Sequence, residues 1–126
     1  MSANSEIAAV RAATQTYLDG LYEGDADKLA AVFHPTSALT QWFDGQLKIM
    51  PRDTWLDWVR NRPSPKTLGL ARADEILAIE QLGPAMAHVK LRCAIPPRHF
   101  TDLLSLLKIE GRWQVAQKVF MTEVRE

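Results

Sequence analysis

Residues 100–122 have the sequence FTDLLSLLKIEGRWQVAQKVFMT, in which two apolar runs flank a Glu-Gly pair. The runs predict two strands, residues 100–109 and 112–122, joined by a turn at Glu110-Gly111. Each predicted strand carries apolar residues on both faces, so one face can cover a core while the other needs a second cover. We expect a dimer partner to pack on that second face; a wider core within one chain is the alternative.

The segments before this hairpin extend it into a β-meander. Residues 85–95 alternate between an apolar and a more polar face, which is typical of a strand with one buried side. Residues 71–82 predict the preceding strand, with a turn at Gly83-Pro84. A shorter hairpin is predicted from residues 38–43 and 46–50, because the Asp-Gly pair between them is a strong two-residue turn signal.

The first half of the chain predicts three helices. Residues 5–22 carry apolar side chains at helical spacing. A second, shorter helix begins after Asp25, which can cap it, and ends before Pro35. The third helix occupies residues 52–62. Because helices gather in the first half and strands in the second, the sequence predicts an α+β fold rather than alternating α/β units.

Composition limits the classes of partner. The length of 126 residues suits one domain, residues 1–126, and a hydrophobic content of 47% can form a sizeable core. Lys plus Arg equals Asp plus Glu at 15 each, so we expect no nucleic acid and no anionic membrane as partner. No apolar stretch approaches the ~20 residues of a membrane span. The first residues also lack the basic and apolar regions of a signal peptide. We therefore expect a cytoplasmic protein.

The sequence contains no recognisable cofactor or metal motif. Cys93 is the single cysteine, lies in an apolar stretch and is expected to be a buried, inert thiol. The histidines at 34, 88 and 99 do not have the spacing of metal ligands, and there is no glycine-rich phosphate loop. We therefore expect no metal and no cofactor.

Two blocks of the sequence resemble nuclear transport factor 2-like proteins. Residues 17–25, YLDGLYEGD, followed by Leu29 and by Phe-His-Pro at 33–35, are similar to the opening of these proteins. Residues 101–113 and 118–120 are similar to their closing hairpin. Within that superfamily of SnoaL-like proteins, the chain most resembles the group described as "putative lumazine-binding".

The resemblance covers nearly the whole chain and implies a specific architecture. It implies a cone-shaped α+β fold, with three N-terminal helices packed on a strongly bent, mainly antiparallel sheet. It also implies a homodimer formed through the sheet, and a ligand pocket at the open end of the cone. This fold serves isomerases, dehydratases, polyketide cyclases, carriers and non-catalytic partners, so it does not fix the function.

Tyr17 is the first candidate catalytic residue. It lies on the apolar stripe of the first helix, where its hydroxyl can act as an oxyanion donor or a general acid. The alternative is a core aromatic residue with one satisfied hydroxyl. Steroid-isomerase-like members of the superfamily use a tyrosine on this helix and an aspartate base on the following strand. The resemblance places that base near Gln41, and because glutamine cannot act as a base we do not expect isomerase chemistry of that type.

His34 and Asp102 are the other catalytic candidates. Histidine is suited to proton transfer near neutral pH, and Pro35 fixes the backbone beside His34; capping of the helix C-terminus is the alternative role. Asp102 occupies a core-facing position, where an acid marks a candidate site because its burial is costly. Its alternative role is an ion pair with Lys118 or Arg92 on a neighbouring strand.

The candidate ligand-binding residues are aromatic or basic. Trp42 and Trp55 are expected to form pocket walls for a flat ligand, and Trp58 is expected to line the mouth or to be partly exposed. His99, beside Arg98, follows two prolines in a predicted loop that can rim the mouth and bind an anionic group. An ordinary solvated loop is the alternative.

These features predict a homodimeric cone that binds a small apolar or aromatic molecule without turnover. The first alternative is a cofactor-independent acid–base enzyme of the dehydratase, cyclase or isomerase type. In that alternative His34 is the base, Asp102 orients or polarises, and Tyr17 stabilises a developing oxyanion. The second alternative is a non-catalytic interaction module whose pocket is filled by its own aromatic side chains.

Overall fold

A computed structural model describes residues 5–125 and confirms the predicted α+β architecture. Three helices and six strands follow one another along the chain. In order they are α1 Ile7–Glu23, α2 Ala26–Val32, β1 Ala38–Phe43, β2 Gln46–Pro51, α3 Arg52–Arg60, β3 Asp74–Gln81, β4 Met86–Ile95, β5 Arg98–Ile109 and β6 Arg112–Val124.

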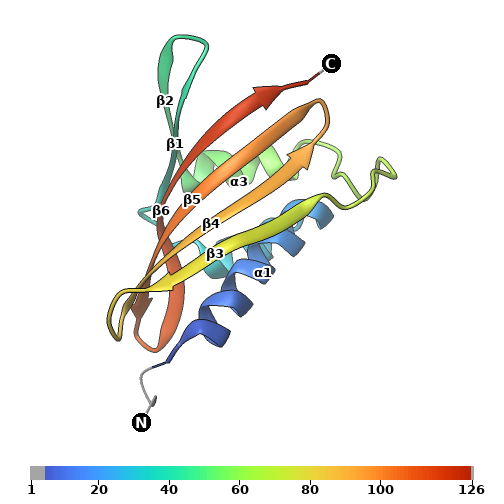
Figure 1. Cartoon of the computed structure of the whole chain (residues 1–126). Helices are drawn as coiled ribbons and strands as arrows, with labels where there is room; N and C mark the ends of the chain where they lie inside the picture. The colour runs from blue at the N-terminus through green and yellow to red at the C-terminus, as the bar shows by residue number, and fades with distance from the viewer. Residues whose placement is uncertain (1–4, 126) are drawn as a thin grey trace.

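The six strands form one sheet in the order β2-β1-β6-β5-β4-β3. All neighbouring pairs are antiparallel except β1 and β6, which run parallel and pair Leu39 with Lys118 and Gln41 with Phe120. The sheet curves around the helices, which cover one of its faces and leave the other uncovered (Figure 1). Within residues 5–125, no helix has the length and apolar content required to span a membrane.

Local sequence signals explain the junction between α1 and α2. Gly24 ends α1 in a left-handed conformation with φ of 67°, which favours glycine. A Cβ atom at this position would also lie 2.7 Å from the Cβ of Ser64, so the loop after α3 can pack closely here. The Asp25 carboxylate then caps α2 by accepting hydrogen bonds from the backbone N–H groups of Asp27 and Lys28, as predicted.

The core lies between the helices and the covered face of the sheet. Every second residue is buried along residues 87–91 of β4 and 102–106 of β5, so the alternation predicted for residues 85–95 is confirmed in its central part. The buried set on these strands comprises Ala87, Val89, Leu91, Asp102, Leu104 and Leu106.

The departure from the predicted boundaries that matters most for the cavity is at the start of β5. This strand begins at Arg98 rather than at residue 100, because Arg98 and His99 pair with Ile95 and Ala94 on β4 and also with β6. β3 begins at Asp74, three residues later than predicted, and α3 ends two residues early. The earlier start of β5 decides which of its first side chains faces the helices.

Candidate functional site

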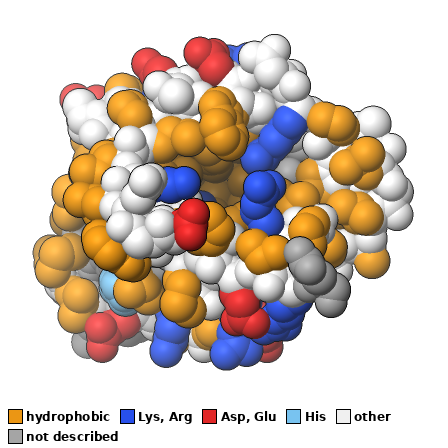
Figure 2. All heavy atoms as spheres, turned by 90° about the horizontal axis from the view of Figure 1, so that it is seen from above, with side chains coloured by type: hydrophobic (Ala, Val, Ile, Leu, Met, Phe, Trp, Pro, Cys, Tyr) orange, Lys and Arg blue, Asp and Glu red, His pale blue; other side chains and the backbone are white. Residues whose placement is uncertain are grey.

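A cavity of about 280 Å³ lies between the sheet and the helices and opens at one end of the molecule. Figure 2 looks onto that end and shows a hollow bordered by hydrophobic side chains, with Lys and Arg atoms at its edge and acidic atoms close by. The walls are mainly apolar and aromatic. They include Leu21, Leu39, Phe43, Met50, Trp55, Trp58, Ile95, Phe100 and Phe120.

Three polar side chains from different elements meet at the inner wall. The Tyr17 hydroxyl on α1 donates a hydrogen bond to Asp102 Oδ2 on β5 over 2.6 Å. The Lys118 ammonium on β6 donates to the Tyr17 hydroxyl oxygen over 2.8 Å, and its Nζ lies 3.5 Å from Asp102 Oδ2. Tyr17 and Lys118 line the cavity, whereas Asp102 is fully buried behind them. We call these three residues the inner polar group.

The strand register explains why this group forms. Lys118 pairs with Leu104, and Asp102 pairs with Phe120, so the acid and the lysine are diagonal neighbours on the covered face. The predicted ion pair between Asp102 and Lys118 is therefore confirmed, while Arg92 lies exposed on the opposite face of β4. This pairing provides a counter-charge for both buried groups.

The electrostatic environment keeps Tyr17 protonated. Burial raises the pKa of the Tyr17 phenol well above its ordinary value, and the negative charge of Asp102 raises it further. A protonated phenol can donate to Asp102 while accepting from Lys118, as observed. The other carboxylate oxygen, Asp102 Oδ1, accepts no hydrogen bond within residues 5–125. Asp102 thus directs its one hydrogen-bonded oxygen toward the cavity wall.

Aromatic rings surround the Lys118 ammonium. The whole Lys118 residue is only 6% exposed. Its Nζ lies 4.4 Å from the ring centroid of Phe120, 5.3 Å from that of Tyr17 and 5.7 Å from that of Trp55. Because ring faces carry negative potential, they favour the charged ammonium. The inner wall therefore presents a cation, held in place by one carboxylate and three rings.

Phe33 supports this wall from behind. Its ring centroid lies 5.3 Å from Tyr17 and 4.9 Å from Trp55, in tilted contacts typical of aromatic pairs. The side chain is fully buried. Phe33 consequently fixes the positions of two cavity-lining rings.

Cys93 also lines the cavity, but as a weakly acidic thiol. Burial, and then the charge of Asp102, raise the pKa of the Cys93 thiol to about 12. The thiolate is the reactive form of cysteine, so this side chain is unreactive near neutral pH, consistent with the expected inert thiol. No cluster of three His, Cys, Asp or Glu side chains in the described part of the chain could hold a metal ion.

His34 lies outside the cavity, which corrects the expectation that it joins Tyr17 and Asp102. Its Nδ1 is 2.8 Å from the Thr36 hydroxyl, and its backbone N–H donates to the carbonyl of Val115. The chain is already extended at the preceding residue, Phe33, whose side chain enters the core. Successive side chains of an extended chain point to opposite sides, so His34 points away from the core.

Two of the four predicted ligand-binding residues also lie elsewhere. Trp42 is 69% exposed on the uncovered face of the sheet, while its neighbours Gln41 and Phe43 line the cavity. His99 pairs with Glu123, and the adjacent Arg98 lines the cavity in its place. In both cases the alternation of a strand assigns the cavity to the neighbouring residue.

Trp55 and Trp58 do line the cavity, as predicted. Gln41 does so too, at the place where the resemblance located an isomerase base, and its Oε1 accepts a hydrogen bond from Thr122 over 2.7 Å. Sequence reasoning missed Arg62 altogether. Helical spacing is the sequence signal that indicates it, because Arg62 follows Trp55 by seven positions and Trp58 by four, which is the spacing of residues on one helix face.

Comparisons with known proteins agree with this architecture. The sequence profile of the family described as "putative lumazine-binding" matches residues 5–121. A nuclear transport factor 2-like protein of unknown function from Silicibacter pomeroyi DSS-3 superposes with a TM-score of 0.84 at 22% identity, covering 98% of this chain and 100% of that chain. A ketosteroid isomerase-like protein from Erwinia carotovora atroseptica SCRI1043 gives 0.74 at 19% identity, covering 97% and 99%.

A named relative is similar in sequence over most of its length. The protein called aldolase FrzH, from Cladobotryum sp., is 28% identical over 119 residues, which is 93% of this chain and 91% of the relative. The two solved structures share only 22% and 19% sequence identity with this chain, so they show its fold and nothing more.

Proposed function

We propose, from the premise that this chain belongs to the "putative lumazine-binding" family of nuclear transport factor 2-like proteins, that its cavity binds a small organic molecule with a flat apolar body. The observation that carries the proposal is the open cavity itself, whose volume of about 280 Å³ is walled largely by aromatic and aliphatic side chains. Ligand pockets in proteins are typically apolar clefts of roughly 300–1,000 Å³ with a few placed polar groups.

Tryptophan fluorescence tests this proposal, since Trp55 and Trp58 line the cavity. Titration with 2-naphthol, a flat probe with one hydroxyl, should quench the emission in a saturable way. Thr122→Trp places a large side chain at the cavity wall and should weaken binding at least about tenfold by occlusion. Glu80→Trp, an exposed position on the edge strand β3, is the matched control. Absence of saturable quenching, or equal binding by the Thr122→Trp variant in calorimetry, would contradict the proposal.

The inner polar group favours a second candidate function, cofactor-independent catalysis on a carbonyl compound. A carbonyl oxygen at the inner wall could accept a hydrogen bond from the Lys118 ammonium, with Tyr17 and Asp102 holding that ammonium in place. Negative charge developing on the oxygen during enolate formation would be stabilised by this preorganised cation. A relative is named an aldolase, and aldol chemistry passes through an enolate or its equivalent.

Binding ranks ahead of catalysis because the cavity wall lacks a carboxylate base. In the part of the chain that the structure describes, the lining side chains include no Asp or Glu, and Gln41 stands at the position expected for the base. The arrangement therefore supplies oxyanion stabilisation, while a proton acceptor would have to come from the substrate or from water.

Deuterium incorporation at the α-carbon of 1-tetralone in D₂O measures enolate formation directly. Under the second candidate, the protein should exceed buffer, and Lys118→Met should lower the rate about 10²–10³-fold, as for loss of one oxyanion donor. Lys90→Met, at an exposed lysine on the opposite face of β4, is the control and should be unchanged. A rate equal to buffer, or a Lys118→Met variant that folds and keeps its rate, would contradict this candidate.

The proposal includes a homodimer formed through the uncovered face of the sheet. Exposed apolar side chains cluster there across neighbouring strands: Trp42 pairs with Leu47, and Val119 on β6 pairs with Leu103. We call the set Trp42, Leu47, Ile49, Leu103, Val119 and Met121 the outer patch. Contiguous exposed apolar surface of this kind marks protein–protein interfaces.

A further inference from the structure

The charge on the cavity wall differs from that of the whole chain. The sequence has 15 basic and 15 acidic residues, yet among residues 5–125 four cations and no Asp or Glu line the cavity. The four are Lys48, Arg62, Arg98 and Lys118. Asp102 balances Lys118, so the other three positive charges at the cavity have no paired acid among the described residues, 5–125.

Arg62 and Arg98 are the more informative of these cations. Within residues 5–125 neither side chain makes a hydrogen bond or an ion pair, whereas Arg52 and Arg72 each contact an aspartate. Arg62 is partly buried as well, so its charge has lost part of its hydration. A partly buried guanidinium that lacks a protein partner is costly, because five N–H donors need acceptors.

The two guanidinium groups also act on each other. Burial lowers the pKa of Arg62 below its ordinary value, and the positive charge of Arg98 acts in the same direction. Like charges that line one cavity are unfavourable in the empty protein, and an anion bound between them would relieve that repulsion. Guanidinium groups are suited to this role because their planar forks match a carboxylate with two parallel hydrogen bonds.

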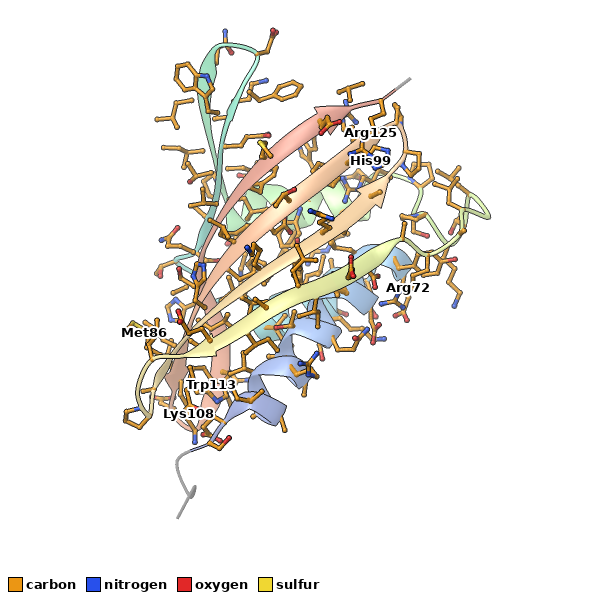
Figure 3. All side chains as sticks on the ribbon, in the orientation of Figure 1. Arg72, Met86, His99, Lys108, Trp113 and Arg125 are labelled. Carbon is orange, nitrogen blue, oxygen red and sulfur yellow. The ribbon has the colours of Figure 1, made fainter. Side chains whose placement is uncertain are left out.

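The distance between these arginines and the inner polar group indicates how long a ligand that reaches both would be. Arg98 begins β5 at the end of the sheet where His99 and Arg125 lie, opposite the end carrying Met86 and Lys108 (Figure 3). Asp102 lies four residues further along the same strand, which corresponds to roughly 13 Å between Cα atoms. Both side chains face the helices. A ligand held at Arg98 can therefore extend along the aromatic walls toward Lys118.

We propose that Arg62 and Arg98 form a subsite for a carboxylate group of the ligand, so that the natural ligand is an aromatic or alicyclic acid. The carboxylate lies near the open end, the apolar body lies against Trp55 and Trp58, and the opposite end points toward Lys118 and Tyr17. Lys48, on the β2 wall of the cavity, adds positive potential. This inference rests on the proposed binding function and specifies the chemical class of its ligand.

Two probes of equal shape and different charge test the subsite. 2-Naphthoate carries a carboxylate, and 2-naphthamide is its neutral counterpart. Calorimetry at low salt should show that the wild-type chain binds 2-naphthoate about 10- to 100-fold more tightly, the effect of charge-assisted hydrogen bonds. The preference should shrink as salt is added, because the site is partly open to solvent.

Variants assign the preference to the two arginines. Arg62→Gln and Arg98→Gln should each remove most of the preference for 2-naphthoate while leaving the affinity for 2-naphthamide nearly unchanged. Arg92→Gln, at an exposed position on the other face of β4, is the matched control and should retain the preference.

The outcomes separate this inference from the binding proposal. Equal affinity of the wild-type chain for the two probes, or a preference that survives in the Arg62→Gln/Arg98→Gln double variant, would overturn the carboxylate subsite and leave the binding cavity standing. Failure of both probes to bind the wild-type chain would overturn the subsite together with the proposed binding function.

Discussion

Replacement of Asp102 by alanine should lower the free energy of unfolding by about 3–5 kcal/mol, the cost of breaking a buried ion pair from one side. Asp102 is fully buried, and the Lys118 side chain beside it is 7% exposed. The substitution leaves the ammonium without a counter-charge and the Tyr17 hydroxyl without its acceptor. Urea denaturation at neutral pH measures the effect as a lower midpoint with an unchanged slope.

A double variant identifies the cause of this loss. Asp102→Ala combined with Lys118→Met removes both charges and should be clearly more stable than Asp102→Ala alone, because apolar replacement of a buried pair is often close to neutral. Asp53→Ala is the control, since that carboxylate pairs with Arg52 while being 78% exposed, and stability should hardly change. A double variant no more stable than the single one would show that the lost volume, rather than the unpaired charge, is responsible.

Introduction of one charge at the centre of the outer patch should convert the proposed dimer into a monomer. Val119 is 52% exposed in the isolated chain and is flanked by Leu103 on β5 and Thr40 on β1. In a dimer Val119→Glu would bury an unpaired carboxylate, which costs more than a typical apolar contact contributes. Size-exclusion chromatography with light scattering should give a dimer mass for the wild-type chain and a monomer mass for the variant.

The matched control for this experiment is Ala31→Glu, which adds the same charge at an exposed position on α2, away from the sheet. It should remain dimeric. A wild-type chain that is monomeric at tens of micromolar, or a Val119→Glu variant that keeps the dimer mass, would refute dimerisation through this face.

The alternation of apolar and polar residues made the fold predictable from sequence. It placed Asp102 on the covered face and named Lys118 as a possible ion-pair partner, and the structure confirms both. The same rule excludes Trp42 from the cavity, because its neighbour Gln41, near which the resemblance locates an isomerase base, lines the cavity. The expectation that Trp42 forms a pocket wall rested on its aromatic character and not on its position in the strand.

The remaining site residues depended on tertiary structure. His99 was placed in a loop because two prolines precede it, whereas pairing with β4 and β6 begins at Arg98 and turns His99 to the other face. Arg62 lies beyond the end of α3, and it lines the same cavity as Arg98, in a segment that no local sequence pattern relates to β5. Sequence periodicity indicates which side of an element a residue occupies, but it does not indicate which elements meet.

The parallel pairing of β1 with β6 makes the site depend on segments that lie far apart in the sequence. Tyr17 and Lys118 hydrogen-bond to each other although 101 positions separate them. β1 has two neighbours in the sheet, β2 and β6, and before β6 is made it can pair only with β2. Contacts between distant segments form slowly, because closing a long loop costs conformational entropy before the contact is made. During synthesis from the N-terminus, the helices and the β1–β2 hairpin therefore emerge well before the strand that closes the cavity wall. Ligand binding should in consequence report that β6 has been made and paired, and a chain shortened to end before β6 should lack the site even where its helices have formed.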